Sequence, residues 1–304
     1  MKYFTPAHLA LLLPGLCLAP VVCAETLELD PSVITGSRSA SPSFDLPYSV
    51  DSINQEQIQD GQLGINASEV LSRVPGLVVQ NRQNYAQDLQ ISSRGFGARS
   101  AFGVRGIKLI ADGIPASTPD GQGQAATFNL DTAERIEVLR GPAATLYGSN
   151  AGGVIQMFSR DGEGPPRIGA ETLVGSDGMS KNHLTAEGAT DDVGFVLDAS
   201  RMDTDGYRDH SAARRDQTFA KLNLKPDEDS KLALIYSSLE QNGTQDPLGQ
   251  SWEAYKADPR SVTPNAITYN TRKSIDHQQL GLNYERYIGD ATLQVNAYTG
   301  KIGR

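Results

Sequence analysis

The alternation of apolar and polar residues changes character near residue 166. Beyond that point apolar side chains recur at every second position, as at Phe195, Leu197 and Ala199. A period of two predicts β-strands that present one apolar and one polar face. About seven such strands are therefore expected between residues 167 and 304.

The lengths of the connections help to distinguish two architectures. A soluble β-sandwich and an outer-membrane barrel both give this alternation. Short turns on one side and longer loops on the other are typical of the barrel. Short breaks occur at residues 190–193, 226–230 and 288–291. The connections at residues 205–216 and 241–274 are long. The connection at residues 175–179 is brief, but its place in the order of strands puts it on the side of the long loops. This arrangement favours a barrel, but seven strands would leave two open edges that lipid does not tolerate. We therefore expect a partial product.

Upstream, the pattern is mixed and indicates one compact domain over residues 45–166. A helix is expected over Asn66–Val74, where apolar residues recur at three and four positions, and Pro75-Gly76 is a typical helix stop. Short apolar runs predict strands at Val50–Ile53, Leu77–Gln80, Leu89–Ser92, Ile107–Ala111, Ile136–Leu139 and Val154–Phe158. The Asp112-Gly113 pair predicts a turn of the hairpin type. The domain is expected to be mixed α/β.

Residues 1–24 have the features of a secretory signal peptide. Lys2 supplies the positive end, residues 9–18 form a short apolar core, and residues 22–24 offer small side chains for cleavage. Cys17 and Cys23 both fall inside this segment, so the mature chain is expected to hold no disulfide and no cysteine-bound metal.

Composition excludes some functions. The net charge of −9 argues against nucleic-acid binding, which needs a basic face. The mean hydropathy of −0.36 does not exclude a membrane barrel, because its strands alternate apolar and polar positions. We find no nucleophile and base constellation, so we expect neither an enzyme nor a resident cofactor or metal. A secreted hydrolase is therefore disfavoured, whereas a soluble periplasmic module stays open.

Glycine and proline punctuate the mixed domain in a recurrent order. The motifs are Val74–Leu77, Arg94–Gly97, Asp112–Pro115, Leu139–Pro142, Tyr147-Gly148 and Ala151–Ile155. This series resembles the plug domain of TonB-dependent outer-membrane receptors. The resemblance implies a mixed α/β plug domain followed by the first strands of an antiparallel transmembrane β-barrel, over residues 45–166 and 167–304. That barrel has 22 strands in the family.

The resemblance also implies a function and partners. Such a receptor lies among the lipids of the outer membrane and imports a scarce small molecule, driven by TonB with ExbB and ExbD. Residues 25–44 would hold the TonB box and a linker, and the box would include Asp30, Val33, Ile34 and Thr35. That apolar, β-prone segment could add as a strand to a partner sheet. Residues 25–29 are a second register.

Arg94 and Arg140 each precede a glycine in these motifs. An arbitrary arginine is most often solvated. At these motif positions, however, the resemblance implies that both arginines lie buried against glutamates of the barrel wall and hold the plug in place. Those glutamates are expected beyond Arg304.

Three polar loops, at residues 81–88, 97–106 and 116–126, are expected to form the ligand-facing apex of the plug. The candidate ligand contacts in them are Arg82, Tyr85, Arg99 and Gln122. Arginine suits carboxylates or phosphates and tyrosine can stack on a flat ring, so these residues favour an anionic, partly aromatic ligand.

Four segments resemble the receptor branch for pyrroloquinoline quinone, a planar tricarboxylate: residues 79–90, 119–124, 206–211 and 269–273. That quinone and a ferric siderophore are both open as ligands. The alternative function is a non-transporting outer-membrane or periplasmic binding or adhesion module built from plug and β-sheet.

Overall fold

The computed structural model describes residues 33–34, 41–42, 48–81, 84–100, 103–118, 120–148 and 150–303. The chain divides into two units, residues 1–31 and 32–304, and only the second contains described residues. The predicted signal peptide, Asp30, Thr35 and Arg82 lie outside the described residues. Val33–Ile34 (β1) pairs antiparallel with Ser41–Pro42 (β2).

The mixed domain, residues 48–159, is built around a five-stranded sheet in the order β3-β8-β9-β6-β7. Its strands are β3 (Val50–Asn54), β6 (Lys108–Ala111), β7 (Ile114–Pro115), β8 (Ala133–Leu139) and β9 (Val154–Ser159). The β6 and β9 pair is parallel, and the other pairs are antiparallel. β4 (Leu77–Gln80) and β5 (Gln90–Ser93) form a separate hairpin. The apolar runs that predicted strands therefore do form them, with ends shifted by three residues at most.

Short helical segments cover this sheet. They are α1 (Gln55–Gln59), α2 (Ser68–Leu71), η2 (Ala125–Thr127), η3 (Leu130–Thr132) and η4 (Pro142–Tyr147). The helix expected over Asn66–Val74 is wrong in length, because α2 makes a single turn. Glu69 folds back to accept hydrogen bonds from the backbone N–H groups of residues 64–66, at 2.7 to 3.0 Å. Pro75 disfavours helical geometry at Val74, so the helix ends early.

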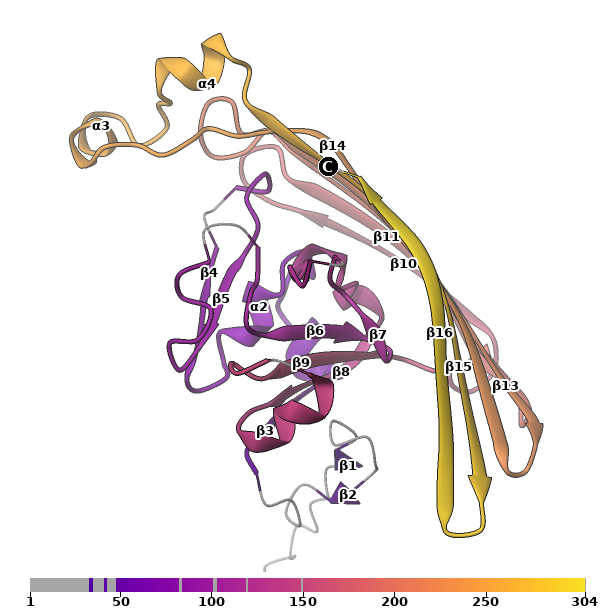
Figure 1. The fold of residues 1–304 in the computed structure, drawn as a ribbon. Coiled ribbons are helices and arrows are strands. Elements are labelled where there is room, and N and C mark those ends of the chain that lie inside the picture. The colour runs from indigo at the N-terminus through magenta and orange to yellow at the C-terminus, as the bar shows by residue number, and fades with distance from the viewer. Residues whose placement is uncertain are drawn as a thin grey trace, which may run out of the picture. The chain divides into compact units, whose positions relative to one another are not determined.

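Seven long strands follow and pair in chain order, each antiparallel to the next. They are β10 (Arg167–Val174), β11 (Ser180–Ala189), β12 (Val193–Thr204), β13 (Ala213–Asp227), β14 (Ser230–Gln245), β15 (Arg272–Ile288) and β16 (Ala291–Gly303). We call this sheet the wall. Figure 1 shows α3 (Trp252–Ala257) and α4 (Pro264–Thr268) in the connection between β14 and β15. The strands reach further into the predicted long loops than the alternation indicated, since residues 213–216, 241 and 244–245 are paired.

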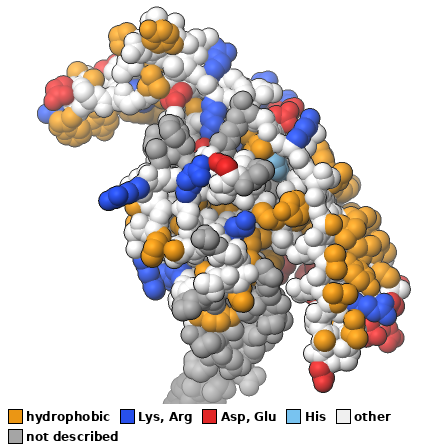
Figure 2. Space-filling view, in the orientation of Figure 1, with side chains coloured by type: hydrophobic (Ala, Val, Ile, Leu, Met, Phe, Trp, Pro, Cys, Tyr) orange, Lys and Arg blue, Asp and Glu red, His pale blue; other side chains and the backbone are white. Residues whose placement is uncertain are grey.

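The two faces of the wall differ as the alternation predicted. One face carries exposed apolar side chains, which gather over the long strands in Figure 2. They include Leu184, Leu197, Leu222, Leu234, Leu280, Leu293 and Val295. The opposite face carries buried polar side chains, such as those of Lys181, Asp198 and Lys221. None of the helices in the described part of the chain is long and apolar enough to cross a membrane.

Candidate functional site

The candidate site is the contact between the mixed domain and the polar face of the wall. Its apolar centre is Ile114, which follows the tight turn at Asp112-Gly113, where both residues have positive φ. The Ile114 side chain is 2% exposed and packs among Val196, Phe219 and Ile235 of three neighbouring strands. A Cβ atom on Gly281 would lie 2.1 Å from Ile114 Cδ1. The wall therefore forms a socket for Ile114 that glycine keeps open.

Lys221 on β13 provides a polar contact beside this socket. Its buried ammonium lies 3.6 Å from Asp112 Oδ1 and 2.6 Å from Asp161 Oδ1, and it donates to the carbonyl oxygen of Ser159 at 3.1 Å. Asp112 also accepts a 2.8 Å hydrogen bond from the Ser159 N–H. On β15, Asn283 donates to the Asp112 carbonyl oxygen at 2.7 Å. The turn at Asp112 is thus fixed to the wall by both its side chain and its backbone.

Two further cations of the wall reach the mixed domain. Lys181 on β11 lies 2.6 Å from Asp131 Oδ1 and donates to the Leu63 carbonyl oxygen at 2.7 Å. Arg215 on β13 is 3% exposed and donates to the carbonyl oxygens of Ile65, at 2.7 Å, and Ala126. A buried cation that loses such acceptors is strongly destabilising. Lysine and arginine of the wall therefore bind carbonyl and carboxylate oxygens of the mixed domain.

The loop at residues 84–88 is held at the other end of the wall. Gln241 donates to the carbonyl oxygen of Tyr85, Gln87 donates to Asp246, and Lys273 lies 2.8 Å from Asp88 Oδ1. The partly buried Tyr85 ring packs against a cluster of Ile65, Met179 and Met202. Burial raises the pKa of the Tyr85 phenol, so the side chain stays neutral. This loop is thus fixed by contacts from strand β14 to strand β15.

The candidate ligand contacts occupy different environments. Arg99 is exposed. Gln122 is 7% exposed and packs beside Gly103, where a Cβ atom would lie 2.2 Å from its Nε2. Gln122 and Tyr85 therefore both pack beneath the loops in this conformation, and neither side chain lies on the loop surface. Nearby, hydrogen bonds from Thr118, Gln122 and Arg105 lower the pKa of the Asp120 carboxyl to about 2. That loop therefore keeps its negative charge at neutral pH.

The two motif arginines both lie close to Gly76 but differ in burial. Arg140 is 6% exposed; it pairs with Asp51, donates to the Pro75 carbonyl oxygen and lies 3.3 Å from Ser49 Oγ. Its carboxylate partner among the described residues is therefore in the mixed domain rather than in the wall. Arg94 has a φ of 49° and is exposed among the described residues. Their contact with glutamates beyond Arg304 stays a prediction.

The contacts from Ile114, Lys181, Arg215 and Lys221 were not predicted from the sequence. Their only signal is the position of the three cations, which stand at inward positions of period-two strands. Such positions are polar in any water-filled or plugged barrel, so charge alone does not show which side chains meet the mixed domain.

These contacts define a class of protein. A mixed domain is fixed to the polar face of an antiparallel sheet whose other face is apolar, which is how a plugged membrane barrel is built. In sequence, residues 42–155 match the TonB-dependent Receptor Plug Domain family. The mixed domain is therefore a plug domain of the TonB-dependent receptors, and the chain has the fold of the plug and the first barrel strands of such a receptor.

Known proteins agree with this assignment. The pesticin receptor of Yersinia pestis is 28% identical over 292 residues, which cover 90% of this chain and 42% of that receptor. The hemin receptor of Yersinia pestis is 30% identical over 208 residues, covering 64% of this chain and 29% of that receptor. The unliganded ferric citrate transporter FecA has a similar fold, with a TM-score of 0.71 and 24% identity over 86% of this chain and 40% of that one. The chain spans less than half the length of these relatives.

Proposed function

We propose that this chain is part of a receptor that imports a scarce anionic small molecule across the outer membrane, driven by TonB with ExbB and ExbD. The observation that carries the proposal is the plug-family match over residues 42–155, together with the fixing of that plug to the wall. A plug held by discrete side chains blocks the lumen of the barrel until a force displaces the plug. Membrane lipid would cover the apolar face of the wall.

Strand pairing supports the expected role of the segment from Asp30 to Thr35. Within it, Val33–Ile34 forms β1 and pairs with Ser41–Pro42. A segment that pairs so briefly can exchange its partner for an edge of a larger sheet. We infer that TonB takes the place of β2 and that pulling on β1 rearranges the plug.

The ligand is pyrroloquinoline quinone or a ferric siderophore. Pyrroloquinoline quinone and the carboxylate type of ferric siderophore are anionic, which fits the exposed Arg99 at the apex and the arginines of the wall loops. In those loops Arg260 stacks over the Tyr207 ring at 4.6 Å. The names of two similar proteins refer to hemin and ferric citrate, which supports the hypothesis that the ligand is an iron chelate. The resemblance of the apex segments supports the quinone.

We expect uptake of one of these ligands to depend on the TonB segment. Cells carrying the full-length receptor would be given pyrroloquinoline quinone and a panel of ferric siderophores, with and without residues 30–35. The substitution Ile34→Pro should abolish uptake as the deletion does, because proline removes a donor needed for strand addition. Ser39→Pro is the matched control and should leave uptake intact. Binding without uptake in every strain would contradict the proposal and favour the non-transporting module.

We also expect Arg99→Ala to weaken binding of the anionic ligand. The loss of one charge-assisted hydrogen bond is worth about 1.5 to 3 kcal/mol, or roughly tenfold to a hundredfold in Kd. Arg105→Ala is the control, since the exposed Arg105 side chain is already paired with Asp120 at 2.9 Å. Its effect should be smaller. Titration of the purified full-length receptor measures both, and equal affinities in wild type and Arg99→Ala would exclude Arg99 as a contact.

A further inference from the structure

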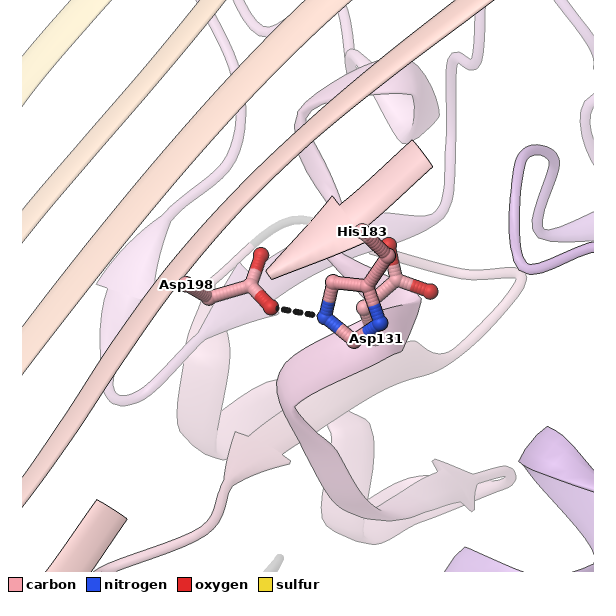
Figure 3. Close-up of side chains that lie close together, drawn as sticks. All are labelled: Asp131, His183 and Asp198. Atoms are coloured by element: carbon pink, nitrogen blue, oxygen red, sulfur yellow. Dashed lines mark hydrogen bonds and ion pairs between the residues drawn. The ribbon is translucent and has the colours of Figure 1, made fainter. Parts of the chain in front are cut away.

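Three side chains that can bind metals meet between the plug and the wall. Asp131 lies on η3, His183 on β11 and Asp198 on β12. One ligand atom from each lies within 4.8 Å of the other two. Figure 3 shows the imidazole of His183 beside both carboxylates, with its Nε2 bonded to Asp198. No residue of this cluster belongs to the proposed ligand or TonB sites.

The strand register explains how the wall residues come together. Asp198 is directly opposite Thr185, two residues after His183 on the same strand and face. The position of Asp198 is fixed from the plug, because Asn129 Nδ2 donates to its Oδ1 at 3.0 Å. Two strands of the wall and one turn of the plug thus supply one donor each.

One carboxylate oxygen of the cluster, Asp131 Oδ2, accepts no hydrogen bond from the described residues. Asp131 Oδ1 is bound by the Lys181 ammonium, whereas its Oδ2 is buried and has no hydrogen-bond partner among the described residues. The Asp131 side chain is 10% exposed. A buried carboxylate oxygen without a donor is unfavourable and needs a partner that the polypeptide does not supply. A cation beside Oδ2 would be such a partner.

The charges around the cluster favour a divalent ion. Glu171 Oε2 lies 3.8 Å from His183 Nδ1, so three carboxylates surround the imidazole against the single ammonium of Lys181. With a neutral imidazole these groups sum to −2. The neighbouring Arg160 is paired with Glu187 at 3.0 Å, and the exposed Arg167 shares the same carboxylate. A divalent cation would therefore neutralise the cluster.

We propose that Asp131, His183 and Asp198 bind one divalent first-row transition-metal ion, for which Zn²⁺ is the probe. One imidazole nitrogen and two carboxylate oxygens form a donor set that such ions accept. The His183 Nε2 would turn from Asp198 to the ion, and water from the adjoining cavity, about 410 Å³ in volume, would complete the coordination. Lys181 and Asn129 hold the carboxylates from outside. The ion would join the plug to two strands of the wall.

The substitution His183→Gln tests the proposal with little change to the contact. Glutamine can still donate a hydrogen bond to Asp198 but is a poor ligand for Zn²⁺. After stripping of the purified full-length receptor with a chelator and titration with Zn²⁺, wild type should bind one more equivalent than His183→Gln. Asp131→Asn should weaken the same site at least tenfold, since even the loss of an outer partner costs about 10- to 100-fold in affinity.

His210→Gln is the matched control. His210 lies in a wall loop, where its Nε2 contacts the carbonyl oxygen of Thr271 at 2.9 Å, and its loss should leave Zn²⁺ binding unchanged. As a second measurement, Zn²⁺ should slow hydrogen exchange at residues 129–132 in wild type and His210→Gln only. Equal Zn²⁺ binding and equal exchange in wild type and His183→Gln would overturn the proposal, whether or not the receptor transports its ligand.

Discussion

The substitution Lys221→Met is expected to loosen the plug by about 3 to 5 kcal/mol, because it leaves a buried carboxylate uncompensated. Asp112 has a side chain that is 5% exposed, and after the change the Ser159 N–H would be the one partner of its Oδ1 among the described residues. Asp161 contributes little to this figure, since its side chain is 69% exposed and stays hydrated. The Asp112 turn should therefore detach from the wall first.

Hydrogen exchange of the full-length receptor measures this loosening. Amides at residues 108–114 and 154–159 should exchange roughly two to four orders of magnitude faster, since about 1.4 kcal/mol is tenfold. Lys225→Met changes an exposed lysine of the same strand and should shift stability by no more than about 0.5 kcal/mol. Adding Asp112→Asn to Lys221→Met should restore part of the protection. If Lys221→Met exchanges like Lys225→Met, the wall lysine does not hold the plug.

The strands could be predicted because their signal is local. Alternation such as that of Phe195, Leu197 and Ala199 reflects an apolar face and a buried face, and both are observed. The glycine and proline motifs likewise placed the turn at Asp112-Gly113, where both residues have positive φ. Short-range physics therefore gave the elements, their order and their class.

The contacts between plug and wall could not be predicted, because they join residues far apart in the chain. Asp131 and His183 belong to different elements with different patterns, and each alone is an ordinary polar residue. Tyr85 was expected at the surface, whereas Gln241 and a cluster of apolar side chains draw it inward. Arg140 pairs with Asp51 on the neighbouring strand, which no motif indicated. These partners are set by tertiary packing and not by local sequence.

The substitution Ile114→Ala is expected to weaken the contact between plug and wall by about 2 to 5 kcal/mol, the usual range for truncating a buried isoleucine. The Ile114 socket is formed by Val196, Phe219 and Ile235, which belong to rigid paired strands and cannot collapse into the space. Faster exchange at residues 108–116 measures the loss. Ile155→Ala is a useful comparison, because it removes an equally buried side chain from the core of the plug itself.

Gly281 makes this prediction specific. In wild type, Gly281→Ala should destabilise the contact by about 1 to 3 kcal/mol through overpacking, because the added Cβ meets Ile114. In the Ile114→Ala background the next atom is Ile235 Cβ at 3.8 Å, an ordinary contact, so the same change should be neutral or stabilising. The coupling energy of the cycle should thus be about 0.5 to 3 kcal/mol, with the second change relieving the first. Additive effects would mean that Ile114 does not occupy the socket opposite Gly281.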